Sequence, residues 1–586
     1  MRHLLKTFSP SWTLISLLGL ALTGGILMGL TTAPVNAWFL AWVALVPLWI
    51  LIIHPFPHPH PHPDPHPQGW GYKNEARLRG LDGNIDMGGP RGLDDNIGLG
   101  SLKHSLLFGL AWGIGYHGIA LFWITGIHPM TWLGVPWLAS LAITLFCWIF
   151  ITLWGASLVV AWSLGMKMAI SSGGMSQPLF PIALLRVLMG VAFWCVLEGL
   201  WSTGSLWWTS LSFTQSPDNL PILQLGKISG PNTITAAIVA VNGLIAETSA
   251  PTLKGGATGT KPACAGFNAS RYWTYLSLAA GLLLTLHLAG FFMYIRPLHD
   301  RPAAALKVGI IQGNIPNEIK LYTAGGRRAL SGYTRGYKTL AAQGVDAVLM
   351  PETALPFVWT AKNNSPFNQA IRETGAIAWV GAFGQEGNSL TNSLFTVTGT
   401  GDIFSRYDKI KLVPLGEFIP FEQFLGKLID RLSPLDAHLV AGKAEQLFET
   451  PFGPAIAAIC YDSAFAEVFR LQAADGGQFI LTAANNAHYS ATMPAQHHAQ
   501  DVMRAIETDR WAVRATNTGY SAIVDPHGRT VWISGINTYE IHAATIYPRQ
   551  TQTLYVHWGD WLTPVLAGLA ALGCIAFWQR LKQLDS

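Results

Sequence analysis

The sequence predicts a membrane α-helical bundle that carries one sheet-rich α/β domain. Of its 586 residues, 50% are hydrophobic, only 12% are charged and 24 are Trp. That balance is wrong for a soluble protein and typical of a polytopic membrane protein. One long stretch, 297–556, instead alternates short apolar runs with polar segments, as a water-soluble domain does. The net charge of +4 is spread thinly and gives no indication of nucleic-acid binding.

About eight stretches are long and apolar enough to cross a bilayer as helices. The first is too long for a removable signal peptide and lacks a convincing cleavage site, so we expect it to be a retained span. The sixth is the weakest, because polar residues such as Asn232 and Asn242 interrupt it. The expected spans lie near 11–31, 35–53, 105–127, 136–163, 182–202, 229–247, 273–295 and 557–579.

Basic residues gather in alternate loops between these spans, and the other short loops contain little beyond Lys227. By the positive-inside rule, the basic loops and both termini face the cytoplasm, and 297–556 lies on the outer side. Eight spans fit this pattern, whereas seven would break it. The orienting residues are Arg2, Lys6, Lys73, Arg77, Arg79, Arg91, Lys103, Lys167, Lys254, Lys261, Arg271, Arg580 and Lys582.

A His/Pro-rich tract, HPFPHPHPHPDPHP, interrupts the helical region. Alternating Pro favours extended polyproline II and prevents a compact ligand cage, so we expect a disordered cytoplasmic insertion here and no metal site. The predicted organisation is two spans in 1–53, the insertion in 54–103, five spans in 104–296, the α/β domain in 297–556, and a last span with a short tail in 557–586.

Apolar strand candidates recur through the α/β domain, and many of them join through tight Gly, Asn or Pro turns. Because strands outnumber helices, the pattern favours a sheet-rich α/β sandwich over a simple doubly wound sheet. The predicted strands are 306–315, 347–352, 378–384, 393–399, 455–462, 478–486, 511–517, 520–526 and 530–535, and the predicted helices are 327–343, 364–374 and 494–509.

Cys460 is the cysteine best placed for chemistry, because it ends an apolar run, AIAAIC, in the soluble domain. Cys147, Cys195 and Cys574 lie in apolar spans, where Cys is usually a small buried hydrophobe, and Cys264 lies in a connecting loop. The five cysteines match neither a disulfide framework nor a zinc site. A thiolate at Cys460 could attack an ester carbonyl, although an isolated cysteine at a strand end is often only structural.

Glu352 and Lys409 are the charged residues that would complete an acyl-transferring thiol site. Glu352 follows a buried strand between two prolines in PETALP, so its carboxylate is held stiffly and can take and return a proton. An ammonium in YDKIK would stabilise developing negative charge. Lys409 and Lys411 point to opposite faces of a strand, and residue chemistry alone leaves open which of them faces the site.

Other polar residues near these positions are candidates for supporting roles. Glu417 and Asp462 could orient the lysine or the cysteine loop, although Asp462 also fits a helix N-cap. His488, His497 and His498 would offer a Cys–His pair, but they lie where a loop enters a helix and their spacing fits no metal site.

Five segments resemble the apolipoprotein N-acyltransferase family, whose members join several membrane spans to an extracytoplasmic nitrilase-like αββα sandwich. They are QGNIP (312–316), PETALP (351–356), YDKIKLVPLGEFIPFE (407–422), ICYD (459–462) and RATNTGYSAIVDPHGR (514–529). The resemblance covers nearly the whole chain except 54–103. Asp462 stands where the family usually has Glu, Leu321 stands where it often has Trp, and the stretch around His488 departs from its Asn-Asp-Ala-Trp-Phe-Gly.

The resemblance implies a triad of Glu352 as base, Lys409 as oxyanion stabiliser and Cys460 as nucleophile, supported by Glu417, Tyr461 and Asp462. It implies acyl transfer from a phospholipid through a Cys thioester to the amine of diacylglyceryl-cysteine in apolipoproteins, at a bacterial inner membrane.

No cofactor and no metal are expected, and we expect a monomer. Two alternatives remain: a membrane-tethered nitrilase-like amidase that hydrolyses small amides, and an inactive membrane binding or transport protein.

Two expectations concern the border between the membrane and the soluble domain. The tryptophans beside the fifth span, Trp201, Trp207 and Trp208, could form a lipid-facing rim with loops 354–360 and 418–424. Glu198, inside that span, is unusual for a lipid-facing position and is expected to face the bundle interior, with no assigned role.

Overall fold

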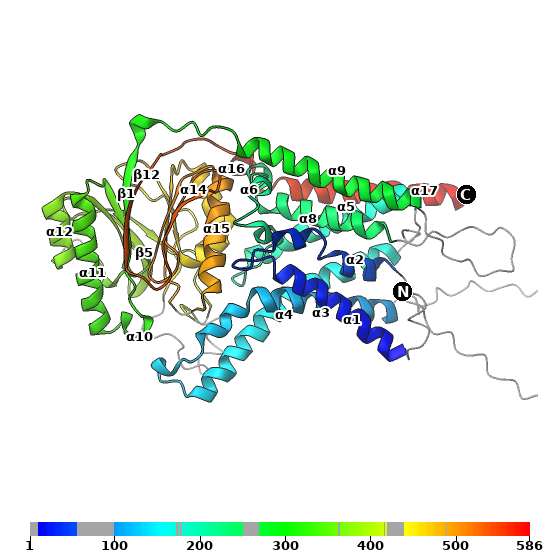
Figure 1. The fold of residues 1–586 in the computed structure, drawn as a ribbon, viewed down its shortest axis with the longest axis horizontal. Coiled ribbons are helices and arrows are strands. Elements are labelled where there is room, and N and C mark those ends of the chain that lie inside the picture. Colours follow the sequence, from blue (N-terminus) through cyan, green and yellow to red (C-terminus); the bar gives the residue numbers. More distant parts are fainter. Residues whose placement is uncertain are drawn as a thin grey trace, which may run out of the picture.

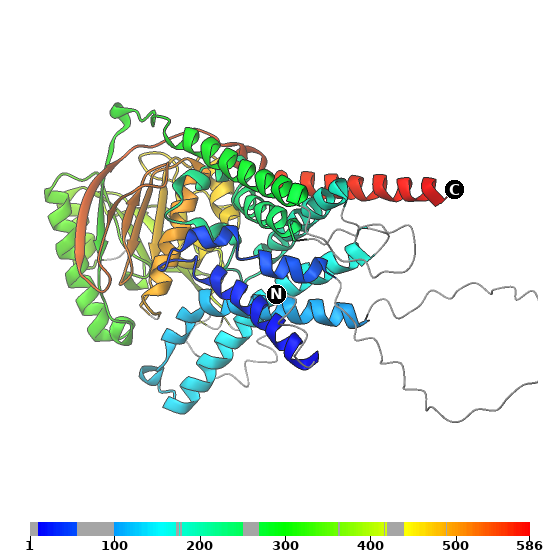
Figure 2. The ribbon, with the colours of Figure 1, turned by 45° about the vertical axis from the view of Figure 1, so that its right-hand side comes forward.

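The structure is a computed structural model that describes residues 10–54, 99–171, 175, 179–249, 269–360, 364–414, 416–418, 439–487 and 489–585. It places a helical region beside an α/β domain, and helix α17 (Leu562–Asp585) returns from that domain into the helical region (Figures 1 and 2). Most of the His/Pro-rich insertion, and Cys264, lie outside these residues. The insertion ends earlier than expected, since helix α3 already begins at Leu99.

Helices occur at all eight predicted spans, but they differ in length and polarity. Four in the described chain are long and apolar enough to cross a membrane, and a fifth qualifies if the pair 220–229 and 231–247, bent by 118°, is one span. The helices are α1 (Pro10–Gly29), α2 (Val46–Ile53), α3 (Leu99–Ala120), α4 (Trp137–Ser171), α5 (Phe180–Thr203), α6 (Leu220–Leu223), α7 (Gly226–Ser229), α8 (Pro231–Glu247), α9 (Ala269–Tyr294) and α17.

The polar residues of α8 explain how this interrupted helix stays buried. The Asn242 side chain accepts hydrogen bonds from the backbone N–H of Leu45 (3.0 Å) and Val46 (3.1 Å) and donates to Ala41 O (2.9 Å). These groups belong to the break before α2, where the helix lacks its own partners. Asn242 therefore satisfies buried backbone groups of a neighbouring helix, which offsets the cost of an amide in an apolar region.

The α/β domain is a sandwich of two sheets. The first has the order β12 (Glu540–Ile546), β1 (Leu306–Gln312), β2 (Ala347–Leu349), β4 (Ile377–Glu386), β5 (Ser389–Val397), β6 (Ile403–Asp408), with β3 (Leu355–Val358) paired to β4. The second has the order β11 (Thr530–Ile533), β10 (Ala522–Val524), β9 (Ala512–Thr516), β8 (Ile480–Ala484), β7 (Ile456–Ile459). All nine predicted strands are present, and β3, β6 and β12 were not predicted.

Apolar side chains fill the layer between the sheets, among them Trp379 from the first and Leu481 from the second. Helices α11 (Thr323–Ala342) and α12 (Pro366–Thr374) cover the first sheet. Helices α14 (Ala466–Ala474), which was not predicted, and α15 (Thr492–Thr508) cover the second and also pack on the helical region in one continuous core. The predicted α/β sandwich is confirmed, and its second helical layer lies between the sheet and the helical region (Figure 1).

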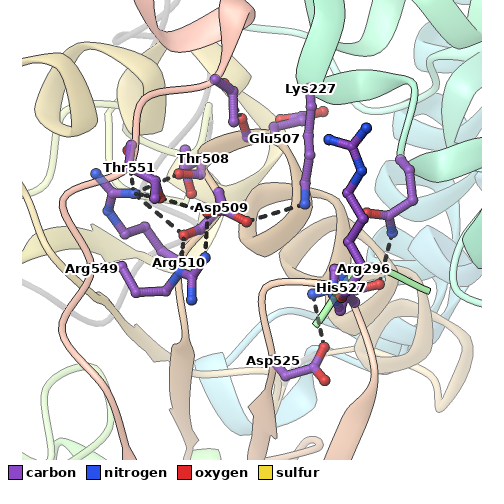
Figure 3. Close-up of polar contacts among 12 residues, drawn as sticks. Lys227, Arg296, Glu507, Thr508, Asp509, Arg510, Asp525, His527, Arg549 and Thr551 are labelled. Atoms are coloured by element: carbon purple, nitrogen blue, oxygen red, sulfur yellow. Dashed lines mark hydrogen bonds and ion pairs between the residues drawn. The ribbon is translucent and has the colours of Figure 1, made fainter. Parts of the chain in front are cut away.

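A buried ion cluster joins the two parts of the molecule (Figure 3). Asp509 accepts from Lys227 of α7 (3.1 Å) and from Arg549 (2.7 Å), which follows β12. Arg549 also pairs with Asp300, in the segment between α9 and β1, at 2.8 Å. Arg549 thus ties the segment that enters the α/β domain to the segment that leaves it, and Asp509 ties both to α7, which fixes how the domain sits on the helical region.

Candidate active site

The ends of strands from both sheets deliver the three predicted side chains to one end of the sandwich. Glu352 follows β2, Lys409 directly follows β6, and Cys460 directly follows β7. Glu352 and Lys409 are 7% and 1% exposed, and Cys460 is 6% exposed. Charges at this depth interact strongly, because little water screens them.

Lys409 links two carboxylates. Its Nζ lies 3.0 Å from Glu352 Oε1 and 2.8 Å from Glu417 Oε2. The Asn392 side chain on β5 donates to Glu352 Oε1 (2.7 Å) and to Glu417 Oε1 (3.0 Å). Lys411, the alternative that residue chemistry alone left open, instead places its Nζ 4.4 Å from the centre of the Phe465 ring. The structure therefore brings Lys409, and not Lys411, to the carboxylates.

The nucleophile candidate is held in an uncommon backbone conformation. Cys460 has φ of 51° and begins a short 3₁₀ helix, Cys460–Ala464. A residue other than Gly in this left-handed region costs about 1–3 kcal/mol and persists only when its surroundings hold it. Its Sγ lies 3.9 Å from Asn485 O. The charges of Glu352 and Lys409 are close enough to shift the pKa of this thiol.

A tight backbone turn also sets the position of Glu352. Thr353 has φ of 42°, and a side chain at Gly381 on β4 would place its Cβ 1.9 Å from Pro351 O. Only glycine lets β4 pass this close to the turn.

The charges of the site favour an ionised carboxylate beside a neutral thiol. Burial opposes ionisation of Glu352, but Lys409 and then Lys320 outweigh it and hold the pKa of this carboxyl below its ordinary value. Burial and the Glu352 charge raise the pKa of Cys460 to about 12, although Lys409 opposes that shift. Burial would lower the pKa of Lys409, but Glu352 and Glu417 raise it well above its ordinary value. A base and an unreacted thiol thus coexist at neutral pH.

Asp462 is a structural clamp on the cysteine loop. Its carboxylate accepts from the backbone N–H of Lys411 (2.7 Å) and Ile459 (3.0 Å) and from the Tyr407 hydroxyl (3.0 Å). It lies inside the 3₁₀ helix, and α14 begins only at Ala466, so the alternative of an N-cap is wrong. Burial raises the pKa of Asp462 to about 6, while the bond from Ile459 N–H opposes the shift.

His497 and His498 hydrogen-bond to a backbone carbonyl and a side-chain hydroxyl, not to the sulfur of Cys460. His497 Nε2 lies 2.8 Å from Cys460 O, and His498 Nε2 lies 3.0 Å from Thr530 Oγ1. Burial lowers the pKa of His497 to about 3, so its ring is neutral. His488 lies outside the described residues. Within those residues no group of three or more His, Cys, Asp or Glu side chains is arranged to hold a metal ion.

Lys320 and Asn392 belong to the site and were not predicted. Lys320 Nζ donates to Glu352 O at 3.0 Å. Burial lowers the pKa of Lys320 to about 8, although Glu352 opposes that shift. Neither residue carries a local signal, because Lys320 lies in a short polar segment and a polar residue such as Asn392 on an alternating strand is ordinary.

Comparisons with known proteins cover both parts of the chain. Residues 307–554 match the carbon–nitrogen hydrolase family, and residues 97–244 match the apolipoprotein N-acyltransferase N-terminal domain. An apolipoprotein N-acyltransferase from Nostoc sp. is 56% identical over 95% of this chain and 99% of its own length. The chain belongs to the apolipoprotein N-acyltransferase family. Another member, from Synechocystis sp., is 46% identical over 93% of this chain and 98% of its own length.

Among solved structures, an amidase from Nesterenkonia sp. is similar to 43% of this chain and covers 94% of its own, with 16% identity and a TM-score of 0.33.

Two of the three tryptophans expected to form a lipid-facing rim do not face outward, whereas Trp201 is half-buried and its Nε1 donates to Trp154 O (3.3 Å). Trp207 and Trp208 are only 7% and 8% exposed, because they lie between the helical region and the α/β domain of this family member. Leu355 and Trp359 of the 354–360 loop are buried too, and 419–424 lies outside the described residues. Glu198 faces the bundle interior as predicted and is 3% exposed.

Proposed function

We propose that this protein transfers an acyl chain from a membrane phospholipid, through a thioester on Cys460, to the N-terminal amine of diacylglyceryl-cysteine in apolipoproteins. The observation that supports it most is the buried Lys409, bound to Glu352 and Glu417, beside a thiol presented at the end of β7. A carboxylate base, an ammonium donor and a cysteine are the groups that acyl transfer through a thioester needs.

In the first half-reaction, Glu352 accepts the proton of Cys460 as Sγ attacks the ester carbonyl of the phospholipid. Lys409 donates a hydrogen bond to the oxyanion. Because the site is buried and contains little water, this bond stabilises the oxyanion strongly. The tetrahedral intermediate collapses by breaking its C–O bond. The leaving oxygen takes the proton from Glu352, lysophospholipid departs, and a thioester remains on Cys460.

In the second half-reaction, the lipoprotein amine attacks the thioester carbonyl, and Lys409 again stabilises the oxyanion. Glu352 accepts a proton from the amine, the C–S bond breaks, and the proton passes to the departing Sγ. The product is an amide on a triacylated lipoprotein, and the enzyme returns to its starting state. Glu417 and Asn392 keep Lys409 and Glu352 oriented through both steps.

The helical region supports this chemistry because both substrates carry acyl chains, which cost about 0.8 kcal/mol per exposed CH₂. We assign eight spans in a bacterial inner membrane, with both termini on its cytoplasmic side. The catalytic unit, 297–556, then lies on the periplasmic side between the seventh and eighth spans, and the protein acts as a monomer.

A trapped intermediate tests the function. The full-length protein is incubated in phospholipid nanodiscs with acyl-labelled phosphatidylethanolamine, and label on Cys460 is located by peptide mapping and by release with neutral hydroxylamine. We expect label on Cys460 that moves to a diacylated lipopeptide and not to its N-acetylated counterpart. Amide hydrolysis without a phospholipid-derived thioester would instead support the amidase, and absence of both would contradict the proposal and support the binding protein.

The pH dependence of thioester formation gives a second test. The pKa of Glu352 lies below its ordinary value of 4.5, so the base is present at neutral pH and is lost only as the pH falls through that lowered pKa. We expect the rate of thioester formation to be flat between about pH 6 and 7.5. Alkylation of Cys460 without phospholipid should rise about tenfold per pH unit over the same range, since the thiol pKa is about 12. An acid limb near pH 6.5 would contradict Glu352 as the base.

A further inference from the structure

The segment 205–216, between α5 and α6, belongs to the helical region but contacts Tyr461, the residue after Cys460, and helix α15. We call it the bridging segment. It contains two buried tryptophans, Trp207 and Trp208, and a short buried 3₁₀ helix, Leu211–Gln215. It therefore offers a physical connection between the buried interior of the helical region and the proposed nucleophile.

Its first contact is with Tyr461, the residue after Cys460. The Tyr461 hydroxyl accepts from Trp207 N–H (3.0 Å) and faces two backbone acceptors, Ser205 O (2.8 Å) and Trp207 O (3.0 Å). The Tyr461 ring stacks on Trp208, with the ring planes 15° apart. The backbone of the bridging segment thus fixes the tyrosine at its hydroxyl, and a side chain fixes it at its ring.

Its second contact reaches Cys460 itself through α15. Trp208 Nε1 donates to Gln496 Oε1 (2.8 Å), and the Trp208 ring lies edge-on to His497, with centroids 5.8 Å apart. His497 Nε2 in turn lies 2.8 Å from Cys460 O. Because the neutral ring accepts at Nδ1 from Asn486 (3.2 Å), Nε2 carries the proton and donates to the cysteine carbonyl.

Glu198 of α5 holds the bridging segment in place. Its carboxylate accepts from Leu211 N–H (2.8 Å) and Ser210 Oγ (3.0 Å), and also from Thr235 Oγ1 (2.8 Å) and Trp194 Nε1 (3.1 Å). A carboxylate can accept all four bonds, whereas a glutamine would turn an NH₂ group toward some of these donors. A carboxylate at position 198, and not an amide, is therefore needed to keep the bridging segment in its observed conformation.

We propose that Glu198 is a positioning residue for Cys460, acting through the bridging segment and Tyr461; this rests on the proposed role of Cys460 as nucleophile. The left-handed backbone of Cys460 persists only if neighbouring groups hold it. Loss of the Glu198 bonds releases the segment, loosens Tyr461 and lets the sulfur leave its attacking position. Because Glu198 is buried and bonded only to protein groups among the contacts described, we expect phospholipid binding to be unaffected.

The test is a double-mutant cycle on the rate of thioester formation in nanodiscs. We expect Glu198→Gln to lower the maximal rate about tenfold, with an unchanged half-saturating phospholipid concentration. Tyr461→Phe removes the hydroxyl that the segment holds. If Glu198 acts through this hydroxyl, the double variant should be no more than about twofold slower than Tyr461→Phe alone. Fully multiplied effects would overturn the proposal, as would a wild-type rate in Glu198→Gln.

Glu247→Gln is the matched control, because Glu247 is a buried carboxylate in the same region that pairs with Arg186 at 2.6 Å and makes no contact with the bridging segment. It should lower thermal stability at least as much as Glu198→Gln, yet keep the rate per folded molecule within about twofold. An equal loss of rate in this control would show a merely structural effect. Glu198→Asp keeps a carboxylate and should recover part of the rate. Absence of a thioester in the wild-type protein would instead remove the proposed function itself.

Discussion

Replacing Cys460 with alanine is expected to abolish lipoprotein acylation, with a loss of about 10⁶-fold that leaves no measurable turnover. Without Sγ no thioester can form, and the two half-reactions lose their shared intermediate. The cost in stability should stay near 1 kcal/mol, because only one buried atom is removed. Acyl transfer to a diacylated lipopeptide, measured beside a thermal unfolding curve, separates the chemical effect from a folding defect.

Cys574→Ala is the control for this change. Cys574 lies on α17, where its Sγ contacts Met189 Sδ at 3.6 Å, far along the chain from the site. The variant should acylate lipopeptide at the wild-type rate. Residual acylation by Cys460→Ala above about one part in 10³ of the wild-type rate would contradict a covalent mechanism. Without the thiol, the charged groups of the site accelerate the reaction only slightly.

Replacing Lys409 with methionine is expected to lower the rate of thioester formation by about 10²–10³-fold, because the oxyanion loses its ammonium donor. The same change leaves Glu352 and Glu417 buried without their cation, at a cost of about 3–5 kcal/mol. Lys409→Arg keeps the charge but not the geometry of Nζ. It should therefore fold better than the methionine variant and still lose most of the rate.

Lys411→Met provides a matched control two residues away. Its ammonium contacts only the Phe465 ring among the interactions described, so the change should cost less than about 1 kcal/mol and leave the rate of thioester formation near wild type. The measurement is single-turnover labelling of Cys460 from phospholipid. Equal losses in Lys409→Met and Lys411→Met would refute the assignment of Lys409 as the oxyanion donor.

The candidate site is partly visible in the sequence because its groups follow apolar runs. Glu352 and Cys460 each follow a run of apolar residues, which is the pattern of a buried strand. Lys409 and Lys411 could not be separated by residue pattern alone, since they follow a strand, β6, that was not predicted; only the family resemblance pointed to Lys409. The contacts of Lys409 in space, with Glu352 and Glu417 in two separate loops, distinguish it from Lys411.

Helix α15 shows the opposite case. Its sequence, TMPAQHHAQDVMRAIET, has a polar face of the kind that solvent usually covers. In the structure that face is buried, because the helical region packs over it, and His497, Gln496 and Arg504 are 0–7% exposed. The local sequence does not predict this burial, since a polar face has the same sequence pattern whether its hydrogen bonds go to water or to another part of the protein.

Hydropathy and strand periodicity by themselves determined the apolar helical region, the two-layered α/β domain and the side chains offered for chemistry, because each depends on neighbours within a few residues. Only the tertiary structure showed that Lys409 contacts Glu352, as the family resemblance implied. It also showed that Trp207 and Trp208 contact Tyr461 instead of facing lipid, and what the Glu198 carboxylate binds. These contacts join residues from 13 to more than 250 positions apart. Their energy comes from packing and hydrogen bonding across the fold, which no local pattern encodes.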